Sequence, residues 1–297
     1  MASRSVAVAF FTLCLALFPG PAVPAGRTAS GQSHVLEGPA GQGFLFPCDV
    51  EVDAQGVLFV LDSGLRSVFL YSADGKFIRA IGGKGVWKDP MGIALTPGRS
   101  ILLADGDAGR VIELDYSGTV RREYSLGKGS RATDAAFYAD LVYCVDNRNG
   151  KILVFRRNGE KAGGWGKQGE ASAEFSSPFR IAIDTSGQVF VTDVMNSRVQ
   201  WFSAYGQPVG GIRAFGTGTG KLFRPSAVAV DGEGGVWVGD SYTGSVQRFD
   251  ARGKFLQVLK SEKGSPAVFE DPSGIARGPG GIWVADQRRR KVSFLRQ

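Results

Sequence analysis

Six aspartates recur along the chain at intervals of 41 to 47 residues and form its most regular chemical feature. Each follows a short apolar run, and they are Asp62, Asp105, Asp146, Asp193, Asp240 and Asp286. A ring of carboxylates could bind cations, but a carboxylate at the end of a strand can also accept N–H bonds from nearby backbone. Because a basic residue stands five positions after four of these aspartates, we favour the structural interpretation.

A second set of charged residues occupies one position of the repeat, two residues after the start of each copy. Asp49, Asp134 and Arg180 stand there, whereas the other copies have Gly92, Ala227 and Gly274. Asp134 and Arg180 belong to neighbouring copies, so we expect a salt bridge between them. Alternatively, Asp49 and Asp134, with Glu51 or Asn147, could hold one divalent cation such as calcium or zinc. We favour a protein without a metal or other cofactor.

The residues around each aspartate indicate short β-strands that position these side chains. A large apolar residue stands three positions before the aspartate, and an aliphatic residue stands six positions after it. In five copies a turn glycine follows at position thirteen, which accounts for part of the 43 glycines. Repeats of this length with four short strands each are typical of propeller blades. We therefore predict an all-β fold, a six-bladed β-propeller of four-stranded antiparallel blades.

The predicted propeller domain covers residues 32–297, with blades that begin near residues 47, 90, 132, 178, 225 and 272. The sixth copy has only three strands before residue 297. We expect residues 32–37 to supply its fourth strand, which would close the ring and leave no open sheet edge between the first and last blades.

The first 25 residues have the features of a secretory signal peptide. Arg4 precedes an apolar run over residues 6–18, which is too short to span a bilayer, and small residues follow at 23–25. We expect residues 26–31 to be a linker and the mature chain to be exported, to the periplasm or the extracellular space, with no transmembrane segment. Cys48 and Cys144 fall on non-adjacent blades, so we predict two free thiols.

The turn after the aspartates resembles the NHL repeat. Residues 146–152 (Asp-Asn-Arg-Asn-Gly-Lys-Ile) and residues 193–199 (Asp-Val-Met-Asn-Ser-Arg-Val) carry the pattern of aspartate, asparagine, a basic residue and an aliphatic residue. Other copies depart from it, since Leu65, Ala108, Thr243 and Arg289 replace the asparagine. The resemblance implies a six-bladed propeller of a family that mainly binds proteins, RNA or carbohydrate-like ligands.

The resemblance implies two groups of enzymatic relatives, and the metal sites of these enzymes can be compared with the residues of this chain. The amidating lyases hold a catalytic zinc with several histidines, whereas this chain has one histidine, His34. An imidazole-rich zinc site within one chain is therefore excluded. Lactonase-like propellers bind a divalent ion in the channel, so Asp49 and Asp134 make a metal-dependent hydrolase the enzymatic alternative. We favour a non-enzymatic role.

The chain is basic, with a net charge of +7, and its bases gather in the loops expected at one face of the disc. Such a face favours an acidic protein or another anionic ligand. RNA binding is a second alternative, against which export argues. We expect a monomer that binds its partner through this face. The candidate binding residues are Arg66, Arg148, Arg180, Met195, Arg198, Tyr242, Arg288 and Arg289.

Overall fold

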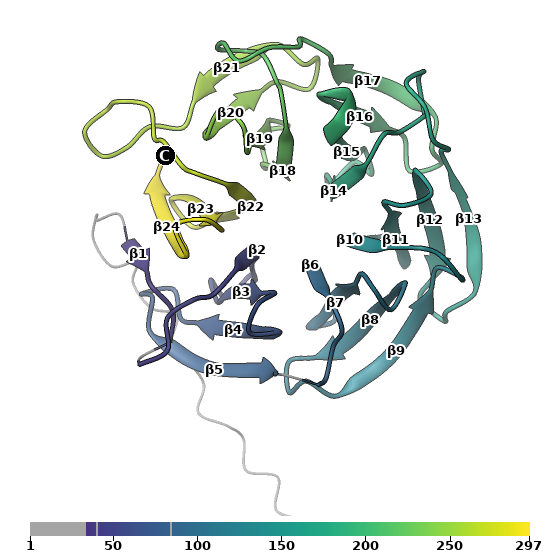
Figure 1. The fold of residues 1–297 in the computed structure, drawn as a ribbon, viewed down its shortest axis with the longest axis horizontal. Coiled ribbons are helices and arrows are strands. Elements are labelled where there is room, and N and C mark those ends of the chain that lie inside the picture. The colour runs from purple at the N-terminus through teal and green to yellow at the C-terminus, as the bar shows by residue number, and fades with distance from the viewer. Residues whose placement is uncertain (1–33, 40, 84) are drawn as a thin grey trace, which may run out of the picture.

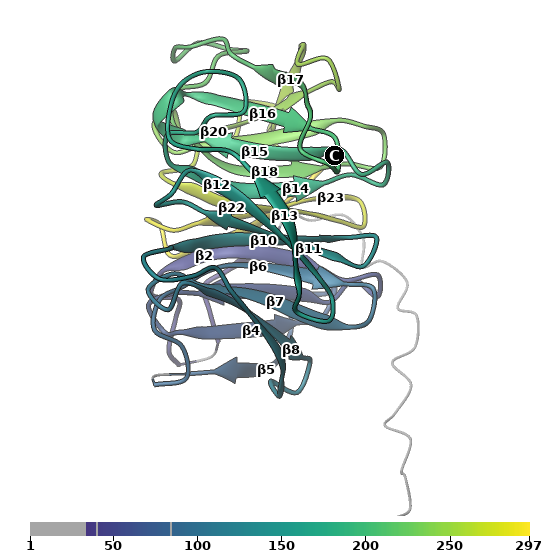
Figure 2. The same cartoon turned by 90° about the vertical axis from the view of Figure 1, so that its right-hand side faces the viewer.

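The computed structural model describes residues 34–39, 41–83 and 85–297, which form six four-stranded antiparallel sheets around a central axis (Figure 1). The predicted all-β, six-bladed propeller is confirmed. In each blade the first strand lies nearest the axis and the fourth lies at the rim (Figure 1). Viewed from the side, the strands of successive blades run across the thickness of the disc (Figure 2).

The first three blades follow the chain from the inner strand outwards. Blade one contains β2 (Pro47–Val52), β3 (Leu58–Asp62), β4 (Ser67–Tyr71) and β5 (Phe77–Gly82). Blade two contains β6 (Pro90–Thr96), β7 (Ser100–Asp105), β8 (Arg110–Asp115) and β9 (Val120–Ser125). Blade three contains β10 (Ala132–Tyr138), β11 (Leu141–Asp146), β12 (Lys151–Arg156) and β13 (Lys161–Trp165).

The other three blades repeat this order. Blade four contains β14 (Pro178–Ile183), β15 (Val189–Asp193), a 3-10 turn over Val194–Asn196, β16 (Arg198–Phe202) and β17 (Pro208–Ile212). Blade five contains β18 (Pro225–Val230), β19 (Val236–Asp240), β20 (Ser245–Phe249) and β21 (Phe255–Val258). Blade six contains β22 (Pro272–Gly278), β23 (Gly281–Asp286), β24 (Lys291–Arg296) and β1 (His34–Leu36).

Strand β1 completes blade six, as the sequence predicted. It runs antiparallel to β24, with His34 opposite Phe294 and Leu36 opposite Val292. Lys291 adds an ion pair to Glu37 at 2.9 Å between Nζ and Oε1. The predicted signal peptide (1–25), the linker (26–31) and residues 32 and 33 lie outside the described residues. The two ends of the propeller therefore meet in one sheet, where β1 covers the outer edge of β24.

The apolar core is divided into six clusters, one between each pair of neighbouring blades. The cluster between blades six and one contains Trp283 from β23 and Tyr71 from β4, and Leu36 of β1 packs against it. Because the core of a blade faces both neighbours, the blades stabilise one another around the closed ring.

The six repeated aspartates are buried and serve as the predicted structural groups. Each accepts backbone N–H bonds from the loop that leads into the first strand of its own blade. In blade five the Asp240 carboxylate binds the N–H groups of Phe223 (2.6 Å) and Arg224 (2.9 Å), and also that of Tyr242 (3.1 Å). The aspartates thus join two sets of loops at the same end of the disc.

Replacement of Leu36 by alanine tests the closure of the ring. Because Leu36 is only partly buried against the last cluster, we expect Leu36→Ala to lower the free energy of unfolding by about 1–2 kcal/mol. Urea unfolding followed by circular dichroism measures this change. The control is Val35→Ala on the same strand, whose side chain is exposed. Equal stability of the two variants would contradict a structural role for β1.

Candidate functional site

A cavity of about 400 Å³ opens at the mouth of the central channel, at the end of the disc where the aspartate-bound loops lie. We call this end the cavity face. All six blades contribute to the lining. A cavity of this size can hold a small ligand or a few side chains of a partner.

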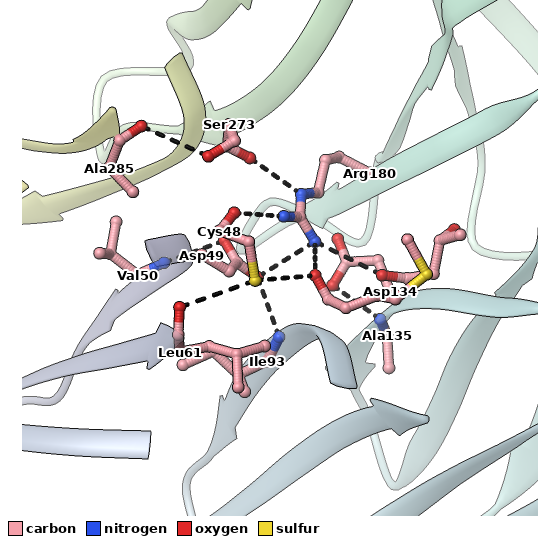
Figure 3. Close-up of polar contacts among 12 residues, drawn as sticks. Cys48, Asp49, Val50, Leu61, Ile93, Asp134, Ala135, Arg180, Ser273 and Ala285 are labelled. Atoms are coloured by element: carbon pink, nitrogen blue, oxygen red, sulfur yellow. Dashed lines mark hydrogen bonds and ion pairs between the residues drawn. The ribbon is translucent and has the colours of Figure 1, made fainter. Parts of the chain in front are cut away.

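The guanidinium of Arg180 forms part of the cavity floor and is buried, with 3% of the residue exposed. Its Nε donates to the carbonyl oxygen of Ser273 at 3.1 Å (Figure 3). Its Nη1 donates to the carbonyl oxygens of Met91 (2.8 Å) and Thr133 (3.4 Å), and its Nη2 donates to that of Cys48. One side chain from blade four therefore binds the backbone of blades one, two, three and six.

Two buried carboxylates stand beside this guanidinium. Asp49 accepts N–H bonds from Val50 (3.0 Å) and from Ile93 of the next blade (2.9 Å). Asp134 repeats this arrangement with N–H bonds from Ala135 and from Ile181 of the next blade, both at 2.9 Å. Each carboxylate thus joins two neighbouring inner strands.

The ion pair of Arg180 differs from the one expected from the sequence. It forms with Asp49 across the channel, at 3.4 Å between Nη1 and Oδ2. Asp134 lies close enough to interact electrostatically with the guanidinium but makes no ion pair with it. Burial raises the pKa of Asp134 to about 8 against the opposing charge of Arg180, and burial also raises the pKa of Asp49.

Glycine is required at two of the equivalent positions because of this close packing. A Cβ on Gly92 would lie 2.5 Å from Oδ1 of Asp134 and 2.7 Å from Nη1 of Arg180. A Cβ on Gly274 would lie 2.6 Å from the Cα of Asp49. The glycines at these two equivalent positions therefore make room for the charged side chains.

The arrangement does not suit the predicted alternative of a divalent cation at Asp49 and Asp134. The cation that faces these carboxylates is the guanidinium of Arg180, and their oxygens already accept backbone N–H bonds. Asn147 uses its amide to donate to the carbonyl oxygen of Pro178 at 2.8 Å. Within residues 34–39, 41–83 and 85–297, no three His, Cys, Asp or Glu side chains gather in a way that could hold a metal ion.

Above this floor the cavity wall combines hydroxyl and amide groups with apolar side chains. The apolar part includes Met91, Phe179 and Met195, and the Phe179 ring lies 4.9 Å from the Arg180 guanidinium carbon. The polar part consists of Ser63, Asn147, Ser177, Ser226, Ser241, Ser273 and Gln287. This mixture can bind a ligand that has both hydrogen-bonding and apolar groups.

The charged groups at the rim are unequally neutralised. Asp89 pairs with Arg131 at 3.0 Å, and Asp271 lies 3.9 Å from Arg288. Burial raises the pKa of Asp271, and the charge of Arg288 opposes this shift. Arg224 is exposed and forms no ion pair with any described residue. It is therefore the rim charge that remains open to a ligand.

The predicted binding residues divide into exposed and buried groups. Met195 and Tyr242 are 61% and 59% exposed, Arg148 and Arg288 are also exposed, and Arg66 is half-buried. Arg289 is exposed but donates to the carbonyl oxygen of Val268 at 2.6 Å.

Arg180 and Arg198 belong to the buried group. Arg198 binds the Asp193 carboxylate at 2.8 Å together with three carbonyl oxygens of the preceding loop. The guanidinium groups of Arg180 and Arg198 are thus used inside the fold, and of the eight candidates only Arg180 and Met195 line the cavity.

Several cavity residues were not singled out from the sequence, although a regular signal marks them. The residue directly after the repeated aspartate lines the cavity in five blades, as Ser63, Asn147, Val194, Ser241 and Gln287. Of these, only Asn147 was named from the sequence, as a possible metal ligand. This position opens the turn at the channel mouth, so the repeat alignment alone identifies it. Its residue types vary among the blades, which is why no chemical motif drew attention to them.

Cys48 and Cys144 are both free and buried, as predicted. Burial raises the pKa of Cys48 to about 12 and also raises the pKa of Cys144. Both side chains therefore remain protonated thiols at neutral pH, where a thiol is a poor nucleophile. Trp87 is buried between blades one and two.

Comparison with solved structures identifies similar propellers at low sequence identity. A streptogramin B lyase structure is 18% identical over 83% of this chain and 77% of that one, with a TM-score of 0.62. A catalytically inactive histidine-to-alanine variant of virginiamycin B lyase from Staphylococcus aureus, with quinupristin, is 12% identical over 90% and 100% of the two chains, with a TM-score of 0.67. A Bacteroides thetaiotaomicron protein of unknown function is 16% identical over 89% of this chain and 76% of that one, with a TM-score of 0.69.

These similarities establish a shared propeller fold and leave function to the residues of the site. No protein-family model matches the chain, so membership of the NHL family stays a prediction. None of the helices in the described part of the chain is long and apolar enough to span a bilayer.

Replacement of Arg180 tests its role in joining the blades. Arg180→Ala leaves four buried carbonyl groups and the Asp49 carboxylate without their donor, so we expect the free energy of unfolding to fall by about 3–5 kcal/mol. Arg180→Lys keeps the charge but has fewer hydrogen-bond donors, so its free energy of unfolding should lie between those of the wild type and Arg180→Ala. Urea unfolding measures all three proteins. An unchanged midpoint for Arg180→Ala would rule out this role.

The raised pKa of Glu51, which lies two residues beyond Asp49 on β2, makes the stability of the protein depend on pH. Burial and the charges of Asp49 and Asp134 raise the pKa of Glu51 well above its usual range. The folded state then binds this proton more tightly than the unfolded state, so the contribution of Glu51 to stability is fully present below about pH 4.5 and is lost as pH rises through the raised pKa.

Glu51→Gln should flatten this decrease, by about 1.4 kcal/mol for each unit of pKa shift. Unfolding free energies from pH 4.5 to 8.5 measure the effect. Glu160→Gln, which alters an exposed side chain, is the matched control and should keep the wild-type slope. A wild-type slope in Glu51→Gln as well would show that Glu51 does not titrate with a raised pKa.

Proposed function

We propose that this chain is an exported, non-enzymatic binding module of the NHL type that holds an acidic protein partner on its cavity face. The main support is the cavity at the channel mouth, to which all six blades contribute hydroxyl, amide and apolar side chains. Protein-binding surfaces combine such an apolar centre with a polar rim.

Exposed apolar residues around the cavity add to this support. Large apolar side chains are normally buried, and an exposed group of them on one face indicates an interaction site. The loops of the cavity face present six of them, namely Phe46, Val86, Met195, Phe215, Tyr242 and Val268. Partner residues could pack on these side chains while acidic groups meet the surrounding bases.

The excess of bases supports an acidic partner. Arg148, Arg224 and Arg288 are exposed on loops of the cavity face, and the chain as a whole carries a net charge of +7. Complementary charge increases the rate of association and selects against basic competitors. Because we propose that the chain is exported, this acidic partner would lie outside the cytoplasm.

Histidine chemistry of the kind suggested by the inactive lyase variant has no counterpart near the cavity. The single histidine, His34, lies on the rim strand β1, where its ring is 6.3 Å from that of Phe294. A lyase similar to the neighbouring structures would need a different catalytic group. The serines of the cavity have no histidine beside them to activate a hydroxyl nucleophile.

Affinity capture from an extract of the native host tests the proposal. With the full chain as bait, we expect a partner that is retained at low salt and released at high salt. Arg148→Glu and Arg288→Glu should each weaken capture about fivefold or more, because they reverse charges on the cavity face. The control is Arg252→Glu, an exposed base at the opposite end of the disc.

Two outcomes would contradict this function. Equal capture by the cavity-face and control variants would place the partner elsewhere on the molecule. Stoichiometric calcium or zinc in the purified protein, lost in Asp49→Asn, would instead support the metal-dependent hydrolase.

A further inference from the structure

Blade five presents a row of three neighbouring aromatic rings on the cavity face. The Phe215 and Phe223 rings are tilted, with centroids 5.3 Å apart, and the Phe223 and Tyr242 rings are stacked, with centroids 4.1 Å apart. Phe215 is 64% exposed and Tyr242 is 59% exposed. The two outer rings are therefore accessible to a ligand.

The rings are held in place by the blade rather than by one another alone. The buried Asp240 carboxylate binds the backbone N–H groups of both Phe223 and Tyr242. Ser197 of blade four donates its hydroxyl to the carbonyl oxygen of Phe223 at 2.7 Å, and Leu222 is fully buried beside it. Because these contacts fix the backbone on both sides of the stack, a ligand would find the rings already in position.

The loop that carries Phe215 and Phe223 is purely basic. Residues 213–224 contain Arg213, Lys221 and Arg224 but no acid. All three bases are exposed, and none forms an ion pair with a described residue. By contrast, Lys167 in the corresponding loop of blade four pairs with Glu174 at 3.0 Å.

Blade six also neutralises its own loop, since Glu270 and Asp271 there lie near Arg289 and Arg288. The aromatic rings and the unneutralised bases thus coincide in blade five. We call this surface, formed by Arg213, Phe215, Lys221, Phe223, Arg224 and Tyr242, the blade-five platform.

The platform is continuous with the cavity. Arg224 and Ser241, which directly neighbour Phe223 and Tyr242 in the chain, both line the cavity wall. The N–H group of Ser241 donates to the carbonyl oxygen of Arg224 at 2.9 Å, which holds the two segments together. A ligand on the rings would therefore extend into the serine-lined cavity.

We propose that the blade-five platform binds an acidic peptide segment that carries an aromatic side chain. The peptide ring would stack on the free face of Tyr242, its carboxylates would meet Arg213, Lys221 and Arg224, and its backbone would reach the hydroxyl groups of the cavity. This inference rests on the proposed function and specifies the chemistry of the partner and the part of the face that selects it.

The ring geometry favours a peptide over a single-stranded nucleic acid. A nucleic acid strand uses several free aromatic faces, one for each successive base. Here Phe223 lies between the other two rings, so the stack offers only its two outer faces. A peptide with one aromatic side chain among acidic residues needs only one ring face and several positive charges, and the outer rings and the three bases provide these.

Fluorescence anisotropy with defined probes tests the proposal on the full chain. The probe is a fluorescein-labelled peptide with four glutamates, one tryptophan and four further glutamates. We expect it to bind at least tenfold more tightly than the same peptide with alanine for tryptophan or with lysine for glutamate. Tyr242→Ala and Arg224→Glu should each weaken binding at least tenfold, and added salt should weaken it further.

The matched control variants lie at the opposite end of the disc. Tyr205→Ala removes an 89% exposed tyrosine from the hairpin between β16 and β17, and Arg252→Glu reverses an exposed base. Both should bind the peptide as the wild type does. Thermal unfolding of every variant separates lost binding from lost folding, and Arg224→Glu provides a second test if Tyr242→Ala is unstable.

Three results would overturn the platform proposal. These are no binding of the acidic peptide by the wild type, equal binding by Tyr242→Ala and Tyr205→Ala, or tighter binding of a labelled nine-nucleotide uridine RNA than of the peptide. If the acidic peptide fails while Arg148-dependent capture of a host partner persists, the platform proposal fails and the proposed function stands. Loss of both results would reject the two together.

Discussion

The whole ring depends on how its axis satisfies buried polar groups. The inner strands of blades one, two, three and six each direct a carbonyl oxygen to the buried guanidinium of Arg180, and a buried carbonyl without a donor would be destabilising. Arg180 supplies the donors, because its guanidinium binds backbone carbonyls of four different blades. Asp49 forms an ion pair with this guanidinium, and Asp49 and Asp134 each accept an N–H bond from the following blade. This close arrangement in turn requires glycine at positions 92 and 274.

A second constraint gives the molecule its rigid cavity face. The repeated aspartates are buried and bind the backbone of the loop that leads into each blade, so those loops cannot move independently of the strands. Side chains carried by such loops are presented in fixed positions, which lowers the entropic penalty of binding. The conserved geometry of the repeat therefore leaves the chemistry to the variable residues between the aspartates, such as Tyr242 in blade five and Arg148 in blade three.

The similar solved structures show how widely this framework is used. Lyases and a protein of unknown function share the fold with this chain at 12–18% identity. In this chain, loops from all six blades meet at the channel mouth, and the shared fold does not determine what the residues there do. In this protein the mouth has serines, amides and apolar groups above a neutralised arginine, and its single histidine lies far away on the rim. The proposed binding role rests on this composition and not on the shared fold.

The architecture could be predicted from the sequence, because the spacing of the repeated aspartates, apolar runs and turn glycines is a local property that each blade satisfies separately. The repeat also identified Asp49, Asp134 and Arg180 as equivalent positions. Their partners could not be predicted, because Arg180 pairs with Asp49 of a blade remote in sequence, and Arg198 is buried. The stack of Phe215, Phe223 and Tyr242 likewise forms only when Asp240 brings two loops together. Such contacts depend on how neighbouring blades pack once the ring is closed, and the sequence of a single repeat does not contain this information.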